Sequence, residues 1–276
     1  MSQTRHGAGT TPPAAELRTA GLSFSARDSV AEIVLCNPAR RNAQTPAMWR
    51  ALAALARAMP ADVRVLVIRA EGPSFSAGLD RSMLDEATDG ETVAGLIHGT
   101  DLAMARTIDE YQAGFTFLRD PNFISIAAVQ GHAMGAGFQL ALACDIRIIA
   151  EDAVFCMKET ALGLVPDLTG LTPLVRQVGY ARALEICVQA RNVDAREALT
   201  LGLAHSVVPT EDLEREVDTL VDSLLQSDAD AAREVKKLLQ SAETLDLEHQ
   251  RHLESAAQIR RLRAIAANRD LPKASR

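Results

Sequence analysis

The spacing of apolar and polar residues predicts alternating strands and helices in the first part of the chain. Two short runs, 22–26 and 30–35, flank a polar turn at 27–29 and predict a β-hairpin. Near-continuous apolar runs at 63–70, 124–130 and 146–150 are typical of strands buried on both faces of a sheet. Helices are expected at 46–59, 101–118 and 136–144, with Thr45 as the N-cap of the first.

The rest of the chain has the spacing of amphipathic helices. Helices are expected at 169–178, 180–189, 195–201, 210–225, 228–242 and 246–268, with a short extended piece at 205–208. This order predicts an α/β core followed by a helical appendage. We therefore expect a flexible N-terminal tail at 1–20, a core at 21–208 and a helical C-terminal region at 209–276.

Composition narrows the class of function. Apolar residues make up 47% of the chain, charged residues 24%, and the net charge is −7, which argues against a nucleic-acid surface. No apolar run reaches the roughly 18 residues of a membrane span, and the N-terminus lacks the apolar segment of a signal peptide. The four cysteines lie far apart without metal-ligand spacing. We expect a cytoplasmic protein with no metal site, no nucleic-acid partner and no membrane.

Two loops that leave buried strands resemble each other. SFSAGLD, at 74–80, follows the strand expected at 63–70, and GHAMGAGFQ, at 131–139, follows the strand expected at 124–130. Glycine at such turns lets the main chain approach another group closely, and unpaired N–H groups there favour negative charge. Two facing turns of this kind would form an oxyanion hole for a carbonyl oxygen.

Either loop alone can instead be a tight turn, and the second also suggests a dinucleotide-binding turn. Glu151 ends the next strand, roughly where a ribose-binding acid belongs. However, Leu140 stands where the third glycine of G-x-G-x-x-G is required, and the helix is short for a Rossmann crossover. The dinucleotide interpretation is therefore disfavoured.

Four ordered segments resemble the crotonase (enoyl-CoA hydratase/isomerase) family. They are NPARRNA at 37–43, FSAGLD at 75–80, GHAMGAGFQLALACDIRI at 131–148 and FCMKETALGLVPDLTG at 155–170. The resemblance runs from about residue 22 to the C-terminus. It implies a crotonase-like spiral of ββα units, a helical C-terminal region that covers the site and forms trimer contacts, and an acyl-CoA thioester as substrate. It also implies a homotrimer or a dimer of trimers, and no cofactor other than the coenzyme A of the substrate.

Carried over to this sequence, the resemblance assigns the oxyanion donors to the backbone N–H groups of Leu79 and Ala136. Many family members have glycine at the second of these positions, so the Ala136 methyl group must be accommodated. The implied coenzyme A contacts come from the two oxyanion loops and the preceding basic loop: Arg40, Arg41, Ala43, Ala77, Gly78, Asp80 and Gly135. Arg40 and Arg41 can equally be ordinary solvated loop charges.

The positions that hold two glutamates in hydratases of the family are Gln139 and Glu159 here. An amide can orient water or substrate but cannot exchange protons at neutral pH, which leaves Glu159 as the acid/base candidate. Asp167 lies at the spacing where dienoyl-CoA isomerases of the family carry an aspartate. Those isomerases also have an acid at the position of Gln139, which this chain lacks. It can alternatively cap a helix that begins near Thr169.

Moving a double bond needs the removal and return of one proton, whereas hydration is easiest with two proton-exchanging groups. The pair Gln139 and Glu159 therefore favours double-bond isomerisation of an enoyl-CoA with Glu159 as proton shuttle, or isomerisation of a dienoyl-CoA that uses Glu159 with Asp167. A hydratase of trans-2-enoyl-CoA is the alternative within the same fold. A third hypothesis is an acyl-CoA-binding protein with little catalysis.

Overall fold

The computed structural model describes residues 10–85 and 92–270, and its main layer is a mixed sheet of six strands within those residues. The hairpin β1 (Leu22–Arg27) and β2 (Val30–Leu35) forms one antiparallel edge. Next to it β3 (Val65–Ala70), β4 (Ile124–Val129), β6 (Ile146–Ala150) and β9 (Ser206–Val208) run parallel, in that order. The strands expected from the apolar runs are confirmed.

The structure also contains a second sheet, of three strands that the sequence pattern did not predict. It contains β5 (His132–Met134), β7 (Val154–Cys156) and β8 (Val193–Asp194). Each strand has two or three residues, too few for a period-2 pattern to appear in the sequence. β4, β5 and the following helix α4 (Ala136–Ala143) form a ββα unit, the repeat that the resemblance implied.

The central strands are buried on both faces, as their apolar runs predict. In β3, Val65 and Val67 face one core cluster, and Leu66 and Ile68 face the other. The larger cluster holds α2 (Pro46–Ala58), α3 (Asp101–Thr116) and α4 against the sheet. The Thr45 hydroxyl caps α2 as expected, because it accepts a hydrogen bond from the main-chain N–H at position 48.

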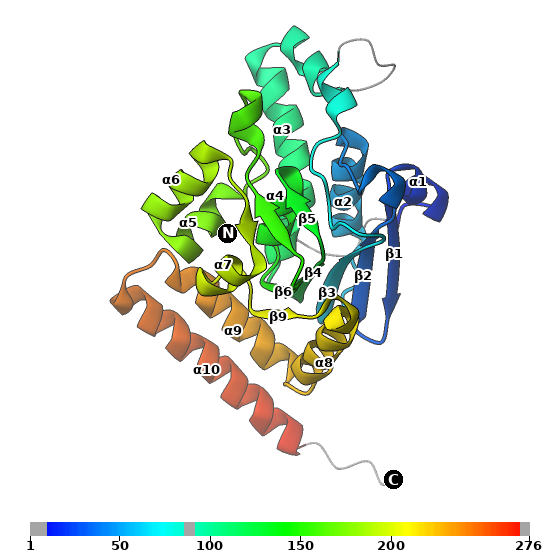
Figure 1. Cartoon of the computed structure of the whole chain (residues 1–276). Helices are drawn as coiled ribbons and strands as arrows, with labels where there is room; N and C mark the ends of the chain where they lie inside the picture. The colour runs from blue at the N-terminus through cyan, green and yellow to red at the C-terminus, as the bar shows by residue number, and fades with distance from the viewer. Residues whose placement is uncertain (1–9, 86–91, 271–276) are drawn as a thin grey trace.

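The remaining helices lie toward the C-terminus, where Figure 1 shows α8, α9 and α10 along one side of the core. Their bounds are α5 (Leu171–Val178), α6 (Tyr180–Gln189), α7 (Ala195–Thr200), α8 (Leu213–Leu225), α9 (Ala229–Ala242) and α10 (Leu247–Asp270). Leu213, Val217 and Val221 of α8 complete the second core cluster on the outer face of the sheet. This part of the C-terminal region is thus a layer of the fold.

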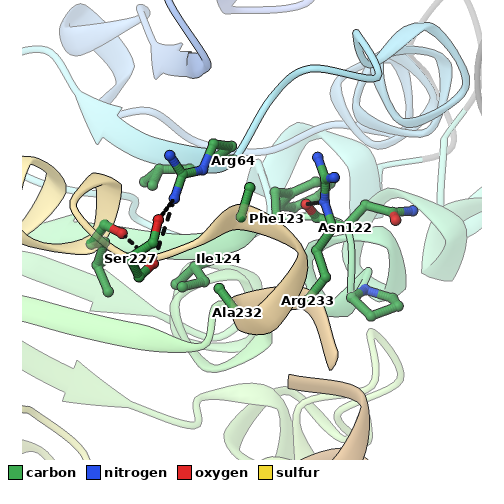
Figure 2. A pocket seen from close by; sticks show the side chains of 11 residues that line it. Arg64, Asn122, Phe123, Ile124, Ser227, Ala232 and Arg233 are labelled. Atoms are coloured by element: carbon green, nitrogen blue, oxygen red, sulfur yellow. Dashed lines mark hydrogen bonds between the residues drawn. The ribbon is translucent and has the colours of Figure 1, made fainter. Parts of the chain in front are cut away.

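Polar contacts fix the C-terminal helices to the core. Arg64 donates to the Leu225 carbonyl oxygen at 3.0 Å and to the Ser227 carbonyl oxygen at 2.6 Å, and Figure 2 shows the contact with Ser227. Its cation therefore stabilises the negative end of α8. In α9, the buried Lys236 donates to Asp145 at 2.6 Å. Asp145 also accepts from Ser125, which explains the acidic residue at the end of α4.

The N-terminal segment differs in part from the predicted tail at 1–20. Residues 14–19 form helix α1 (Ala14–Thr19), and Leu17 packs into the main core with 3% of its surface exposed. One buried leucine therefore anchors a segment whose polar composition suggested a loose chain. Residues 1–9 of the predicted tail lie outside the described residues. Within 10–85 and 92–270 no helix is both long and apolar enough to cross a bilayer.

Candidate active site

The two similar loops lie side by side because they are hydrogen-bonded to each other. The Ser76 N–H donates to the His132 carbonyl, and the Met134 N–H donates to the Ser76 carbonyl, both at 2.9 Å. This pairing runs the first loop parallel to β5. A Cβ atom on Gly78 would lie 2.4 Å from the Met134 oxygen and 3.6 Å from the Ala136 nitrogen. The turn can approach this closely only because residue 78 is glycine.

The main-chain N–H groups of Leu79 and Ala136 follow directly after these turns. Gly78 and Gly135 have φ values of 82° and 48°, a conformation that favours glycine. Neither N–H has a hydrogen-bond acceptor among the described residues, and both residues line one pocket. Ala136 opens α4, so its N–H also stands at the positive end of a helix. That the two N–H groups converge on one carbonyl oxygen stays a prediction.

Glu159 lies against the same pocket, at the start of the 3₁₀ turn η5 (Glu159–Leu162) that follows β7. Its side chain is buried, with 9% exposed. Oε1 accepts a hydrogen bond from Gln139 at 2.7 Å, whereas Oε2 has no partner. Burial raises the pKa of this carboxyl, and the hydrogen bonds that it accepts only partly oppose the rise. Glu159 therefore lies in the pocket wall with a raised pKa and with one carboxylate oxygen, Oε2, buried and without a hydrogen-bond partner.

Gln139 is buried within α4, and protein groups occupy its amide. Its Oε1 accepts from the N–H groups of Leu168 and Gly170 at 2.9 and 3.2 Å, and its Nε2 donates to Glu159. Only 1% of the residue is exposed. The structure thus gives this glutamine protein partners in place of the predicted water or substrate.

Asp167 reaches the same pocket from the segment between η5 and α5. Burial by the surrounding atoms raises the pKa of its carboxyl, although the residue stays exposed to the open pocket. Helix α5 begins at Leu171 with Gly170 as its N-cap and no side-chain cap bond. The helix-cap interpretation of Asp167 is therefore wrong, and its carboxylate is available to the pocket.

Three of the residues predicted to contact coenzyme A line this pocket: Ala77, Gly78 and Gly135. Arg40, Arg41, Ala43 and Asp80 are not part of its wall. Asp80, which is 6% exposed, accepts from Arg40 at 2.8 Å and from the Ser82 N–H at 3.1 Å. Its role in the structure is to join the basic loop to the first oxyanion turn.

The basic loop supports that turn through its main chain. The Arg41 carbonyl accepts from the Ala77 N–H at 2.8 Å, and the Ala43 N–H donates to the Arg40 carbonyl at 3.1 Å. Both arginine side chains are exposed beside the site, and the Arg40 guanidinium is paired with Asp80. Their predicted contact with phosphates of coenzyme A stays a prediction.

Sequence reasoning missed a buried polar network under the first turn. The Asn42 amide donates to the carbonyls of Glu71 and Ser74 at 2.9 Å, and the Ser76 hydroxyl donates to the Asn42 carbonyl at 2.7 Å. Ser76 also accepts from the Gly78 N–H at 3.2 Å. The sequence signal was present in the small polar residues beside glycine, but their partners are up to 34 positions apart.

The pocket is mainly apolar, with a volume of about 220 Å³. The sequence did not identify most of its wall, which comes from separate helices and loops: Trp49, Leu84, Val93, Leu96, Tyr111, Leu162, Leu164, Val165 and Leu168. Two exposed cations, Arg81 and Lys158, stand at the same wall. Among the described residues, no three His, Cys, Asp or Glu side chains are arranged to hold a metal. The arrangement suits an apolar chain attached to a polarised carbonyl.

Comparison with known proteins gives the same family as the motifs. The enoyl-CoA hydratase/isomerase family model matches residues 25–263. A "probable enoyl-CoA hydratase" of Mycobacterium tuberculosis is 32% identical over 66% of this chain and 65% of that protein, so the chain spans slightly less than two thirds of that relative. The mitochondrial Δ(3,5)-Δ(2,4)-dienoyl-CoA isomerase of Rattus norvegicus is 34% identical over 68% of this chain and 58% of that protein.

A solved structure extends the likeness to almost the whole fold. The crystal structure of a "putative enoyl-CoA hydratase" from Thermobifida fusca in complex with acetoacetyl-CoA is 49% identical. It superposes with a TM-score of 0.89 and covers 92% of this chain and 100% of that one. The family match over most of the chain, together with the paired turns and this superposition, establishes the identity of the fold. The chain belongs to the crotonase, or enoyl-CoA hydratase/isomerase, family.

Proposed function

We propose that this protein moves the double bond of an enoyl-CoA thioester through an oxyanion-stabilised enolate, with Glu159 as the proton shuttle. The thioester oxygen would accept from the N–H groups of Leu79 and Ala136, which have no acceptor of their own among the described residues. Acetoacetyl-CoA in the Thermobifida fusca relative supports a thioester ligand. The apolar pocket wall supports an acyl chain beyond the carbonyl.

One carboxylate can carry out both proton transfers of the reaction. In a 3-enoyl-CoA, Glu159 would take a proton from C2, and the electrons of that C–H bond would form the enolate held by the two N–H donors. The same carboxyl would return the proton to C4, which leaves the double bond between C2 and C3. The observation that carries the proposal is that Glu159, whose buried Oε2 has no hydrogen-bond partner, lines the same pocket as the two donor residues.

Gln139 supports isomerisation over hydration. Hydration needs one group to activate water and another to deliver a proton. At the position where a second carboxylate would act, the Gln139 amide is tied to Leu168, Gly170 and Glu159. A side-chain amide neither gives up nor takes up a proton at neutral pH, so Gln139 cannot act as the second acid or base.

A second candidate is isomerisation of a dienoyl-CoA, which one further observation supports. Asp167 and Glu159 both line the pocket, so two carboxylates border the same space. Shifting two conjugated double bonds moves a proton over a longer distance than a single shift, which two separate carboxylates can accomplish. The dienoyl-CoA isomerase name of the Rattus norvegicus relative is consistent with this candidate.

Parallel assays on one preparation test these candidates. The protein should convert a 3-enoyl-CoA to the 2-enoyl-CoA at least ~100-fold faster than it hydrates crotonyl-CoA, the range that one positioned acid/base group contributes; a 3,5-dienoyl-CoA tests the second candidate. Hydration at the faster rate would replace the proposal with a hydratase. Tight binding of all three thioesters without turnover would identify an acyl-CoA-binding protein.

We also propose that the protein assembles as a homotrimer or as a dimer of trimers. Apolar side chains on α9 and α10 stand exposed in the single chain, among them Val235, Leu239, Leu247 and Leu262, at 53–77%. Exposed apolar side chains of this kind are typical of surfaces that associate. Sedimentation equilibrium tests the assembly: a trimeric or hexameric mass supports it, and a monomer at micromolar concentration contradicts it.

A further inference from the structure

The orientation of the Gln139 side-chain amide is determined by its neighbours. The main-chain N–H groups of Leu168 and Gly170 can only donate, so the amide oxygen must face them. The NH₂ group therefore faces Glu159 and donates to Oε1 at 2.7 Å. Three hydrogen bonds to three separate positions hold this amide, and the residue is 1% exposed.

The turn at 168–170 depends on that amide for its shape. Thr169 has a φ of 69°, a strained conformation for a β-branched residue. The N–H groups on its two sides converge on one oxygen, as in the main-chain nests that bind anions. A Cβ atom on Gly170 would lie 2.6 Å from Gln139 Cγ, so the turn packs directly on the glutamine stem.

The Glu159 carboxylate is confined from two sides. Gly135, which precedes the Ala136 donor, faces it closely: a Cβ atom there would lie 3.2 Å from Oε1 and 3.6 Å from Oε2. Gln139 holds Oε1 from the other side. The carboxylate plane is thus fixed relative to the oxyanion turn, and only Oε2 is left without a partner.

We propose that Gln139 is a positioning residue: it locks Glu159 so that Oε2 alone exchanges protons with the acyl chain, and it holds the turn next to Asp167 in its strained shape. Glu159 and the segment that carries Asp167 are thereby joined through one amide. The inference rests on the proposed function only in taking Glu159 as the base. It replaces the predicted contact of Gln139 with substrate or water by contacts within the protein.

The test is the pH dependence of kcat/KM for Gln139→Met, which keeps the length of the side chain and removes all three hydrogen bonds. The bond from Nε2 stabilises ionised Glu159, so its loss should move the acidic limb of the profile up by about one pH unit. Gln139 belongs to the pocket wall, but its amide groups bond to protein groups, so KM should stay within about twofold if the inference holds. Gln177→Met, a partly buried glutamine on α5 outside the pocket, is the matched control and should leave the limb in place.

A second variant, Gln139→Glu, keeps the shape of the side chain. One new carboxylate oxygen can accept from the two N–H groups of the turn, and the other then faces Glu159 Oε1, so the two carboxylates must share a proton. The limb should move further than in Gln139→Met. An unmoved limb in both variants, or a rise in KM of about tenfold, overturns the inference and assigns Gln139 to substrate binding.

A third measurement needs only the wild-type protein, so it remains decisive if the variants fail to fold. In a crystal structure with butyryl-CoA, a saturated thioester, the Gln139 amide should keep its three protein partners and make no contact with the acyl group. An amide turned to the thioester or to a water beside it overturns the inference. If the wild type only hydrates, the proposed function fails, and the same pH comparison on the hydration reaction still tests the role of Gln139.

Discussion

Substituting Glu159 by glutamine separates the chemistry of the site from its packing. The two side chains have almost the same shape, and the amide oxygen of the introduced glutamine can still accept from Gln139 Nε2, which lies 2.7 Å from Oε1 in the wild type. The group at the position of the unpartnered Oε2 changes from a carboxylate oxygen to an NH₂. The variant therefore loses proton exchange and keeps the local structure.

The expected loss of turnover follows from the role of a positioned acid/base group. Such a group contributes about 10²–10⁴-fold to a rate, so kcat for isomerisation should fall by a factor in that range or by more. Thioester binding should persist, because the donors at Leu79 and Ala136 belong to the main chain. In the wild type, kcat/KM should fall on the acid side as Glu159 takes up a proton. Burial raises its pKa, so this limb should lie above the ordinary value of 4.5.

The free energy of unfolding should not fall with the turnover in Glu159→Gln. A carboxyl whose pKa is raised in the folded state binds its proton more tightly there than in the unfolded chain. The wild type therefore loses stability as pH rises through the interval from 4.5 to the folded pKa, and that cost remains at neutral pH. Glu159→Gln removes the ionisation, so it should unfold at neutral pH with a free energy equal to or higher than the wild type.

Steady-state kinetics and urea unfolding, both measured across pH, provide the assay. Glu151→Gln, at an exposed position away from the pocket, is the matched control and should change neither quantity. Turnover within about tenfold of the wild type would refute the role of Glu159 as shuttle. A variant less stable than the wild type at neutral pH would show that the hydrogen bond from Gln139 to the ionised carboxyl outweighs the cost of burying its charge.

Three further substitutions test separate parts of the structure. Asp167→Asn should lower dienoyl-CoA isomerisation at least ~10-fold and change 3-enoyl-CoA isomerisation less than ~3-fold, in assays with both substrates. Gly78→Ala should lower kcat/KM more than ~10-fold and should destabilise the fold in urea more than the control Gly163→Ala does. Gly163 has a similar φ (72° against 82° at Gly78), but its new Cβ would have no atom within 4 Å. Equal effects of the two substitutions would contradict the close approach at Gly78. Lys236→Met should cost about 2 kcal/mol in urea unfolding, less than a fully buried pair because the Asp145 side chain is 21% exposed; an unchanged midpoint would show that the pair does not anchor α9.

The local sequence was sufficient for the main strands, most helices and the four motif segments. Apolar runs such as 63–70 carry their own evidence of burial on two faces, because side chains alternate between the faces of a strand. Glycine at positions 78 and 135 and the carboxylate at 159 are also local signals, because each residue type has a distinct conformational or chemical property. These local signals predicted the paired turns, whereas the resemblance to the family was needed to name the two N–H donors and Glu159 as the acid/base candidate.

Only the tertiary structure decided how these pieces meet. Gln139 and Asp167 look polar and available in the sequence, but the fold gives the glutamine three protein partners and leaves the aspartate in the pocket instead of at a helix cap. β5 becomes a strand because β7 pairs with it about twenty positions further along the chain, and Leu17 anchors a segment expected to be loose. These outcomes depend on contacts between residues far apart along the chain. The free energy of such a contact depends on which partner is present and on its geometry, and neither can be read from a short stretch of sequence.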